Sequence, residues 1–202
     1  MRIIKTTLVI LSVITMSSCA SGYKVIAPEN IKYVSTNTVD NVKLEYKYDL
    51  LVKKYTKKEV KEGVKVVAIK ITNNSDKDLM FGRELTLRYA DDTELYIMES
   101  DRVFKTLKQS PASYLWYLLL SPMNLYTTGN DGQQTSSTPI GLAIGPGLAG
   151  GNMITAGSAN KKFKNELLDY DINGTIIKKG ETKYGLIGVI ADSFDAIKLK
   201  LE

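Results

Sequence analysis

The sequence predicts a mainly β protein: an antiparallel two-sheet sandwich with a helical, glycine-rich insertion, so that the whole chain is of the α+β class. Two observations indicate this fold. Short segments on both sides of the insertion alternate apolar and polar residues with a period of two, which is typical of half-buried strands. Between Lys108 and Lys161 the chain carries a single charged residue, Asp131, although 24% of its residues are charged. This second observation marks the insertion, which we place at about residues 100–170.

The first strand of the body is expected at residues 42–50, where apolar and aromatic residues alternate with charged ones. The residues before it, 19–40, are small, polar and suited to extended backbone, and they predict a tether with a short strand at 31–34. The residues after it, 53–63, carry five lysines and two glutamates and predict a solvated, charged loop. The body, residues 41–202, is expected to form one domain.

Later segments repeat the strand pattern. Residues 64–72 are rich in β-branched side chains and end at 73–78, a run of turn-forming residues. Further strands are expected at residues 79–81, 85–89, 94–98, 176–177, 182–191 and 197–201. About seven or eight strands are enough for a two-sheet sandwich.

The insertion has parts of different composition. Residues 112–126 are aromatic and aliphatic, follow Pro111 and predict a short helix. Residues 127–138 are rich in Gly, Gln, Ser and Thr and predict a mobile polar stretch. Residues 139–158 are apolar and glycine-rich, and the apolar spacing within 160–170 predicts an amphipathic helix.

Three interpretations of the insertion are open. The first is a helical layer packed on the sandwich, in which glycines let two backbones approach closely. The second is a surface that dips into the membrane or binds a partner. The third is a pair of transmembrane segments, although a helix over 112–126 reaches only about 22 Å, against a hydrocarbon core of about 30 Å. The candidate contact residues are Tyr114, Leu115, Trp116, Tyr117, Leu118, Gly141 and Gly145.

The composition excludes several kinds of chemistry. The chain has no histidine and one cysteine, which removes Ser-His-Asp triads, Cys-His nucleophiles and His-ligated zinc. Without Arg2 and Lys5 of the N-terminal segment, the 27 basic residues become 25 against 22 acidic ones, and this excess is too small and too interspersed to predict a nucleic-acid partner. We therefore expect a non-catalytic protein with no cofactor and no metal. The alternative enzyme is a hydrolase of envelope polymers that uses paired carboxylates.

The N-terminus carries a separate pattern. Arg2 and Lys5 give a short basic start, residues 8–14 are apolar, and Met16-Ser17-Ser18 stands directly before Cys19. This pattern resembles the bacterial lipoprotein signal and its lipobox, in which leucine is more usual than methionine at the first position. The resemblance implies cleavage before Cys19 and lipidation of that residue by palmitate-type acyl chains.

The same resemblance implies a place in the cell. Residues 1–18 would be the signal peptide, residues 19–40 the lipidated tether, and the acyl chains would hold the protein in the membrane. Residues 20–22 lack the aspartate that often retains such lipoproteins at the inner membrane. The expected location is therefore the bacterial cell envelope, at the outer membrane facing the periplasm.

The strand pattern of residues 41–98 is similar to the small immunoglobulin-like sandwiches common in bacterial lipoproteins. This similarity concerns architecture, because a fold does not determine a function. The expected function is binding or scaffolding at the membrane, with the insertion as the working surface and an envelope protein as a further partner. A membrane-perturbing or oligomerising protein that acts through the glycine-rich segment is a second alternative.

Overall fold

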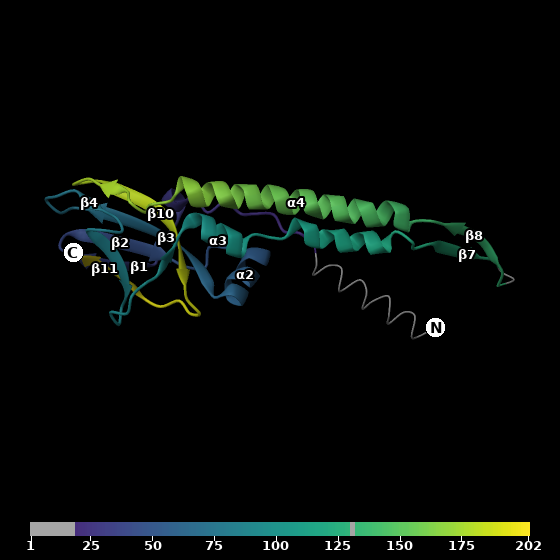
Figure 1. Ribbon diagram of the computed structural model, residues 1–202, viewed down its shortest axis with the longest axis horizontal. Helices are drawn as coiled ribbons and strands as arrows, with labels where there is room; N and C mark the ends of the chain where they lie inside the picture. The colour runs from purple at the N-terminus through teal and green to yellow at the C-terminus, as the bar shows by residue number, and fades with distance from the viewer. Residues whose placement is uncertain (1–18, 130–131) are drawn as a thin grey trace. The chain divides into compact units, whose positions relative to one another are not determined.

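The computed structural model describes residues 19–129 and 132–202 of the chain (Figure 1). The predicted signal peptide, residues 1–18, lies outside the described residues. The chain divides into two compact units. Of the described residues, unit 1 comprises 19–22 and Gln109–Ala159, and unit 2 comprises Tyr23–Lys108 and Asn160–Glu202.

Unit 2 is built on a five-stranded antiparallel sheet. In spatial order its strands are β1 (Ser35–Val39), β2 (Val42–Lys47), β3 (Val64–Asn73), β10 (Thr182–Ile190) and β6 (Ile97–Met98). The longest pairing joins β3 and β10, from Thr182 opposite Thr72 to Ile190 opposite Val64. Consecutive residues of both strands are buried, which explains why both segments are continuously apolar in the sequence.

Two shorter antiparallel pairs also belong to unit 2. They are β4 (Leu79–Met80) with β9 (Ile176–Ile177), and β5 (Leu85–Tyr89) with β11 (Ile197–Leu201). Their apolar side chains share one buried core with those of the five-stranded sheet. The large sheet also bonds to β11 directly, because the Ile197 N–H donates to the Tyr46 hydroxyl over 3.0 Å.

The helices of unit 2 carry an aromatic cluster. These helices are η1 (Pro28–Asn30), α2 (Lys54–Glu62), α3 (Ser100–Leu107) and the part of α4 (Gly141–Asp169) that follows Ala159. Tyr23, Tyr55 of α2 and Phe163 of α4 pack on one another, with ring centroids 5.1 to 5.3 Å apart. Phe104 of α3 joins the cluster through Phe163, at 6.2 Å. Edge and tilted contacts of this kind add stability beyond the burial of apolar area.

Unit 1 is a hairpin of helical segments that continues into a pair of strands. Its elements are the 3₁₀ helix η2 (Pro111–Leu120), β7 (Leu125–Thr128), β8 (Gln134–Thr138) and α4 up to Ala159. β7 and β8 pair antiparallel. The Gly141 N–H donates to the Met123 carbonyl over 2.9 Å and joins the two arms. Among the described helices, none combines the length and the apolar character that crossing a membrane requires.

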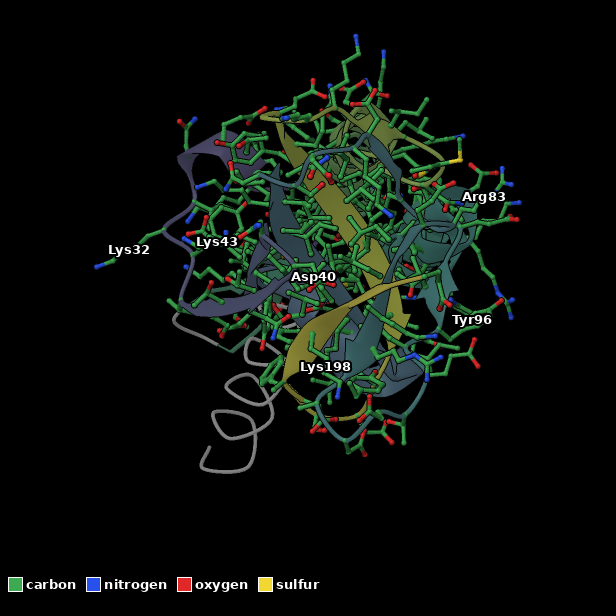
Figure 2. The ribbon with its side chains drawn as sticks, turned by 90° about the vertical axis from the view of Figure 1, so that its left-hand side faces the viewer. Lys32, Asp40, Lys43, Arg83, Tyr96 and Lys198 are labelled. Carbon is green, nitrogen blue, oxygen red and sulfur yellow. The ribbon has the colours of Figure 1, made fainter. Side chains whose placement is uncertain are left out.

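The two units differ in their charge. Charged side chains project from unit 2, as the labelled Lys32 and Arg83 do in Figure 2. Some of these charges pair within the sheet, where Glu45 of β2 lies 2.8 Å from Lys70 of β3. None of the described residues of unit 1 is charged.

The α+β class predicted from the sequence is confirmed, because antiparallel sheets occur with a long helix. The alternating or β-branched segments form strands as expected. The amphipathic helix predicted within 160–170 is also present, as the C-terminal part of α4. The confirmed strands are 42–47, 64–73, 79–80, 85–89, 97–98, 176–177, 182–190 and 197–201.

Four local predictions differ from the structure. The short strand expected at 31–34 lies at 35–39. Residues 53–63, expected as a loop, form α2, because Tyr55 and Glu59 stand four residues apart and are both buried. The helix expected over 112–126 ends at Leu120 as η2, and the expected mobile stretch at 127–138 contributes to β7 and β8.

A substitution at Gly188 of β10 tests the packing of α3 on the sheet. A Cβ atom at this position would lie 2.1 Å from Cγ2 of Val103. We expect Gly188→Ala to lower the free energy of unfolding by about 1–3 kcal/mol, as overpacking does in other cores. Val103→Ala in the same chain should recover part of that loss. Urea unfolding of the two single variants and the double variant measures the coupling, and strictly additive losses would contradict the contact.

Candidate functional site

The residues directly after Cys19 are bonded to unit 1. The Ala20 N–H donates to the Asn152 side-chain oxygen over 2.5 Å. Ser21 and Gln109 form a reciprocal pair, in which the Ser21 N–H donates to Oε1 over 3.1 Å and Nε2 donates to the Ser21 carbonyl over 2.7 Å. Cys19 itself is exposed. An acyl chain on Cys19 would therefore start next to Asn152 of α4.

The following residues are bonded within unit 2. The Glu166 carboxylate accepts the Ile26 and Ala27 N–H groups over 2.8 and 3.0 Å, and the Tyr23 hydroxyl over 2.5 Å. Burial, followed by the bond to Glu166, raises the pKa of the Tyr23 hydroxyl, so that it stays protonated and donates. Several residues of the predicted tether, 19–40, are thus held by side chains that come from far along the sequence.

Unit 1 exposes an apolar surface without charge. Ten of the eighteen exposed large apolar side chains in the described chain belong to it, although it is the smaller unit. We call this set the apolar surface of unit 1. Its members are Leu115, Trp116, Leu118, Leu119, Met123, Leu125, Tyr126, Leu142, Ile144 and Ile154. Exposed apolar side chains that are concentrated in one unit favour a membrane or partner contact, whereas ordinary surface carries them singly.

The candidate residues from the sequence separate into two groups. Leu115, Trp116 and Leu118 are 46%, 74% and 43% exposed and belong to the apolar surface of unit 1. Tyr117 is half-buried and its ring stacks on that of Tyr114 with centroids 6.4 Å apart. Tyr114, Gly141 and Gly145 are buried within the unit. The buried members support the exposed ones and do not form the surface themselves.

Gly141 and Gly145 bring the two arms of unit 1 together. A Cβ atom on Gly141 would lie 2.2 Å from the carbonyl oxygen of Leu120, and one on Gly145 would lie 3.0 Å from that of Tyr117. One interpretation of the insertion expects close backbone approach at Gly141, Gly145, Gly147 and Gly151, and the first two of these glycines lie close to the backbone of η2. Gly147 and Gly151 have no atom within 4 Å of the corresponding position and face open space.

Sequence analysis did not identify Asn152, Gln109 or Glu166. Residues 142–151 contain no polar side chain, and Asn152 is the first after them. That position is a signal which could have singled out Asn152. Its partner Ala20 lies 132 residues earlier in the chain, and nothing local indicates the bond.

Unit 2 contains a cavity lined by aspartates. It has a volume of about 550 Å³, and Asp91, Asp192 and Asp195 line it together with Tyr89 and Ser193. Bonds from the hydroxyl and the N–H of Thr93 lower the pKa of Asp91, which is therefore an ionised acceptor. Within the described part of the chain, no group of three or more His, Cys, Asp or Glu residues could hold a metal ion.

Glu59 of α2 is a buried carboxyl of unit 2. It is 3% exposed and accepts the Val66 N–H over 2.8 Å. Burial raises its pKa to about 7, while the bond from Val66 acts in the opposite direction. It does not line the aspartate cavity.

No protein-family model matches the chain, and no curated protein or solved structure matches it either.

The raised pKa of Glu59 predicts a pH dependence of stability. The unfolded chain releases this proton near pH 4.5 and the folded chain near 7. The free energy of unfolding should therefore fall as the pH rises through this interval, by up to about 3 kcal/mol. Glu59→Gln keeps an acceptor for Val66 and should remove this slope. Urea unfolding at a series of pH values measures it, with the exposed Glu62→Gln on the same helix as the control. A slope that persists in Glu59→Gln would assign it to another group.

The close approach at Gly141 predicts a steric effect on unit 1. Gly141→Ala places a methyl group against the backbone of η2, and we expect a loss of about 1–3 kcal/mol in the stability of this unit. Gly151→Ala on the same helix meets open space and should stabilise the helix by up to about 1 kcal/mol. Trp116, the one tryptophan of the chain, reports thermal unfolding of this unit by its fluorescence. Equal stability of the two variants would exclude the close contact.

Proposed function

We propose that this protein is a lipid-anchored protein of the bacterial cell envelope, with a non-catalytic role in binding or scaffolding at the membrane. Its working surface is the apolar surface of unit 1. One observation carries the proposal: the residues that follow Cys19 are bonded through Asn152 and Gln109 to the same unit that exposes uncharged, apolar side chains. Anchor and contact surface therefore belong to one structural unit.

Two further facts support lipidation of Cys19. The signal-like pattern of residues 1–18 ends directly before this residue, which is the only cysteine of the chain. Each buried methylene of an acyl chain contributes about 0.8 kcal/mol, so that two or more chains hold a protein at the membrane for long periods. The proposed location is the outer membrane, facing the periplasm, and an envelope protein is a further proposed partner.

For the body we propose the immunoglobulin-like sandwich that the strand pattern resembles. The shared core of the five-stranded sheet and the β5–β11 and β4–β9 pairs supports this proposal, because a sandwich buries the inner faces of two sheets together.

A carboxylate-dependent hydrolase is less well supported. Such an enzyme needs a general acid that keeps its proton, facing a second carboxylate across a cleft. The pKa of Asp91 in the aspartate cavity is lowered, which suits an ionised group. Glu59 holds its proton longer but is buried away from that cavity. A membrane-perturbing or oligomerising role would use the same apolar surface, and its test is contained in the experiments below.

The anchor is tested by Cys19→Ser. Without the thiol, no acyl chain can be attached, and we expect unprocessed precursor and no incorporation of labelled palmitate. The wild-type chain should be shorter by residues 1–18 and should carry the label. Mass spectrometry of the N-terminus identifies the modification directly. Label in the Cys19→Ser chain, or a bare thiol on the mature wild type, would disprove the lipoprotein assignment.

A further inference from the structure

We infer that the apolar surface of unit 1 contacts lipid hydrocarbon, and that η2 and residues 141–151 of α4 enter the leaflet that holds the acyl chains of Cys19 without crossing the bilayer. This inference rests on the proposed function, because the lipid on Cys19 sets which membrane and which leaflet are within reach.

The first step concerns the position along α4 at which the residues after Cys19 are bonded. Asn152 is the first polar side chain after ten residues, 142–151, that have none, and it accepts the N–H of Ala20. The glycerol-linked acyl chains on Cys19 would therefore begin where the apolar part of α4 ends. The polar boundary of the helix and the covalent anchor coincide, as they would at a headgroup layer.

The second step is the length and character of the helical part. Residues 141–151 cover about 16 Å at a rise of 1.5 Å per residue, which is too short to cross a hydrocarbon core of about 30 Å. Leu142 and Ile144 are both exposed, and two helix positions that are two residues apart point in nearly opposite directions. A helix that is apolar on several sides is found in a protein core or in lipid. Only one side of this helix is covered, by η2 at Gly141 and Gly145.

The third step is the far end of unit 1. Every described residue of β7 and β8 is exposed, and most are Ser, Thr or Gln. Their hydroxyls bond to one another, as those of Thr127 and Ser136 do over 2.9 Å, but the two-stranded sheet has open edges. Unpaired backbone groups are not tolerated in hydrocarbon. This end therefore stays in the headgroup layer on the side of the anchor. Because both ends of the helical part are then at that layer, η2 and residues 141–151 lie along the leaflet with their apolar side chains in hydrocarbon, and the chain does not cross.

Lipid fits this surface better than a protein partner. Protein interfaces surround an apolar centre with a polar, solvent-accessible rim, in which charged residues are common. Among the described residues of unit 1 no charged side chain borders the apolar surface. Hydrocarbon needs no such rim, and the acyl chains already bring the unit to the bilayer.

The experiment uses the acylated full-length chain in vesicles of phosphatidylethanolamine and phosphatidylglycerol. Trp116 is the one tryptophan and is 74% exposed, so its emission reports on unit 1 alone. We expect a blue shift on vesicle binding and quenching by lipids that carry bromine on their acyl chains. If the protein floats with the vesicles while Trp116 emits as in water, the inference fails and the proposed anchor stands. If the wild-type protein does not float, the proposed function fails first.

A pair of substitutions provides a matched control. Leu142→Asp replaces a side chain that is 65% exposed, at a helix start where a carboxylate is compatible with folding. It should abolish the blue shift in the acylated chain. In an unacylated Cys19→Ser chain prepared without residues 1–18, it should reduce vesicle binding by about tenfold or more, because a carboxylate in hydrocarbon is costly. Val60→Asp on α2, with 71% exposure, should change neither. Equal effects of the two substitutions would overturn the inference.

A label distinguishes entry into one leaflet from crossing. Ser137→Cys on β8 places a thiol at the exposed end of the hairpin, while the thiol of Cys19 is occupied by lipid. The acylated protein is added to preformed vesicles, so that it binds their outer leaflet. A maleimide that cannot cross the bilayer, added outside, should then label this thiol fully. Labelling only after the vesicles are opened would mean that the hairpin has crossed. If the Ser137→Cys thiol instead cross-links between copies of the chain, and brominated lipids do not quench Trp116, the apolar surface of unit 1 serves self-association.

Discussion

Every charged side chain among the described residues belongs to unit 2, and this separation governs how each unit can be solvated. In unit 2, lysines and glutamates alternate with buried residues along the strands, so that one face of β2 meets water and the other the core. The described residues of unit 1 carry no charge with which to hold a water-facing layer over its apolar side chains. Such a unit is more stable where its exposed apolar side chains leave water on one side, and a membrane surface provides that environment.

Glycine has a different consequence at each of its positions in unit 1. Gly141 and Gly145 are buried against the backbone of η2, and a single methyl group there would push the arms apart. Gly147 and Gly151 lie on the same helix with open space in front of them. These two glycines lower the stability of the helix relative to alanine, and they do not allow any closer packing inside the unit. Their backbone is accessible to whatever covers the helix, and lipid chains adapt to such a surface more easily than a folded partner does.

The fold could be predicted where the signal is local, and it could not where the signal is spread along the chain. Val42, Leu44 and Tyr46 of β2 are all buried, as their alternation indicates. Residues 53–63 are rich in lysine, and only Tyr55 and Glu59 of α2 are buried, so the segment has no apolar periodicity that would predict a helix. The composition identified the apolar insertion but not which of its residues face inward. Tyr114 and Trp116 differ by two positions and are 3% and 74% exposed. Tyr114 stacks on Tyr117, and the composition gives no sign of which aromatic residue makes such a contact.

The reciprocal bonds between Ser21 and Gln109 have a consequence for reach. A lipoprotein with a long unstructured stalk can sample partners across a wide gap, since a flexible chain of n residues extends over several ångströms times the square root of n. If residue 19 is the lipidated N-terminus, as we propose, the backbone is fastened to the folded unit two residues after the anchor. The protein would then stay close to the bilayer, and a partner would have to approach it there.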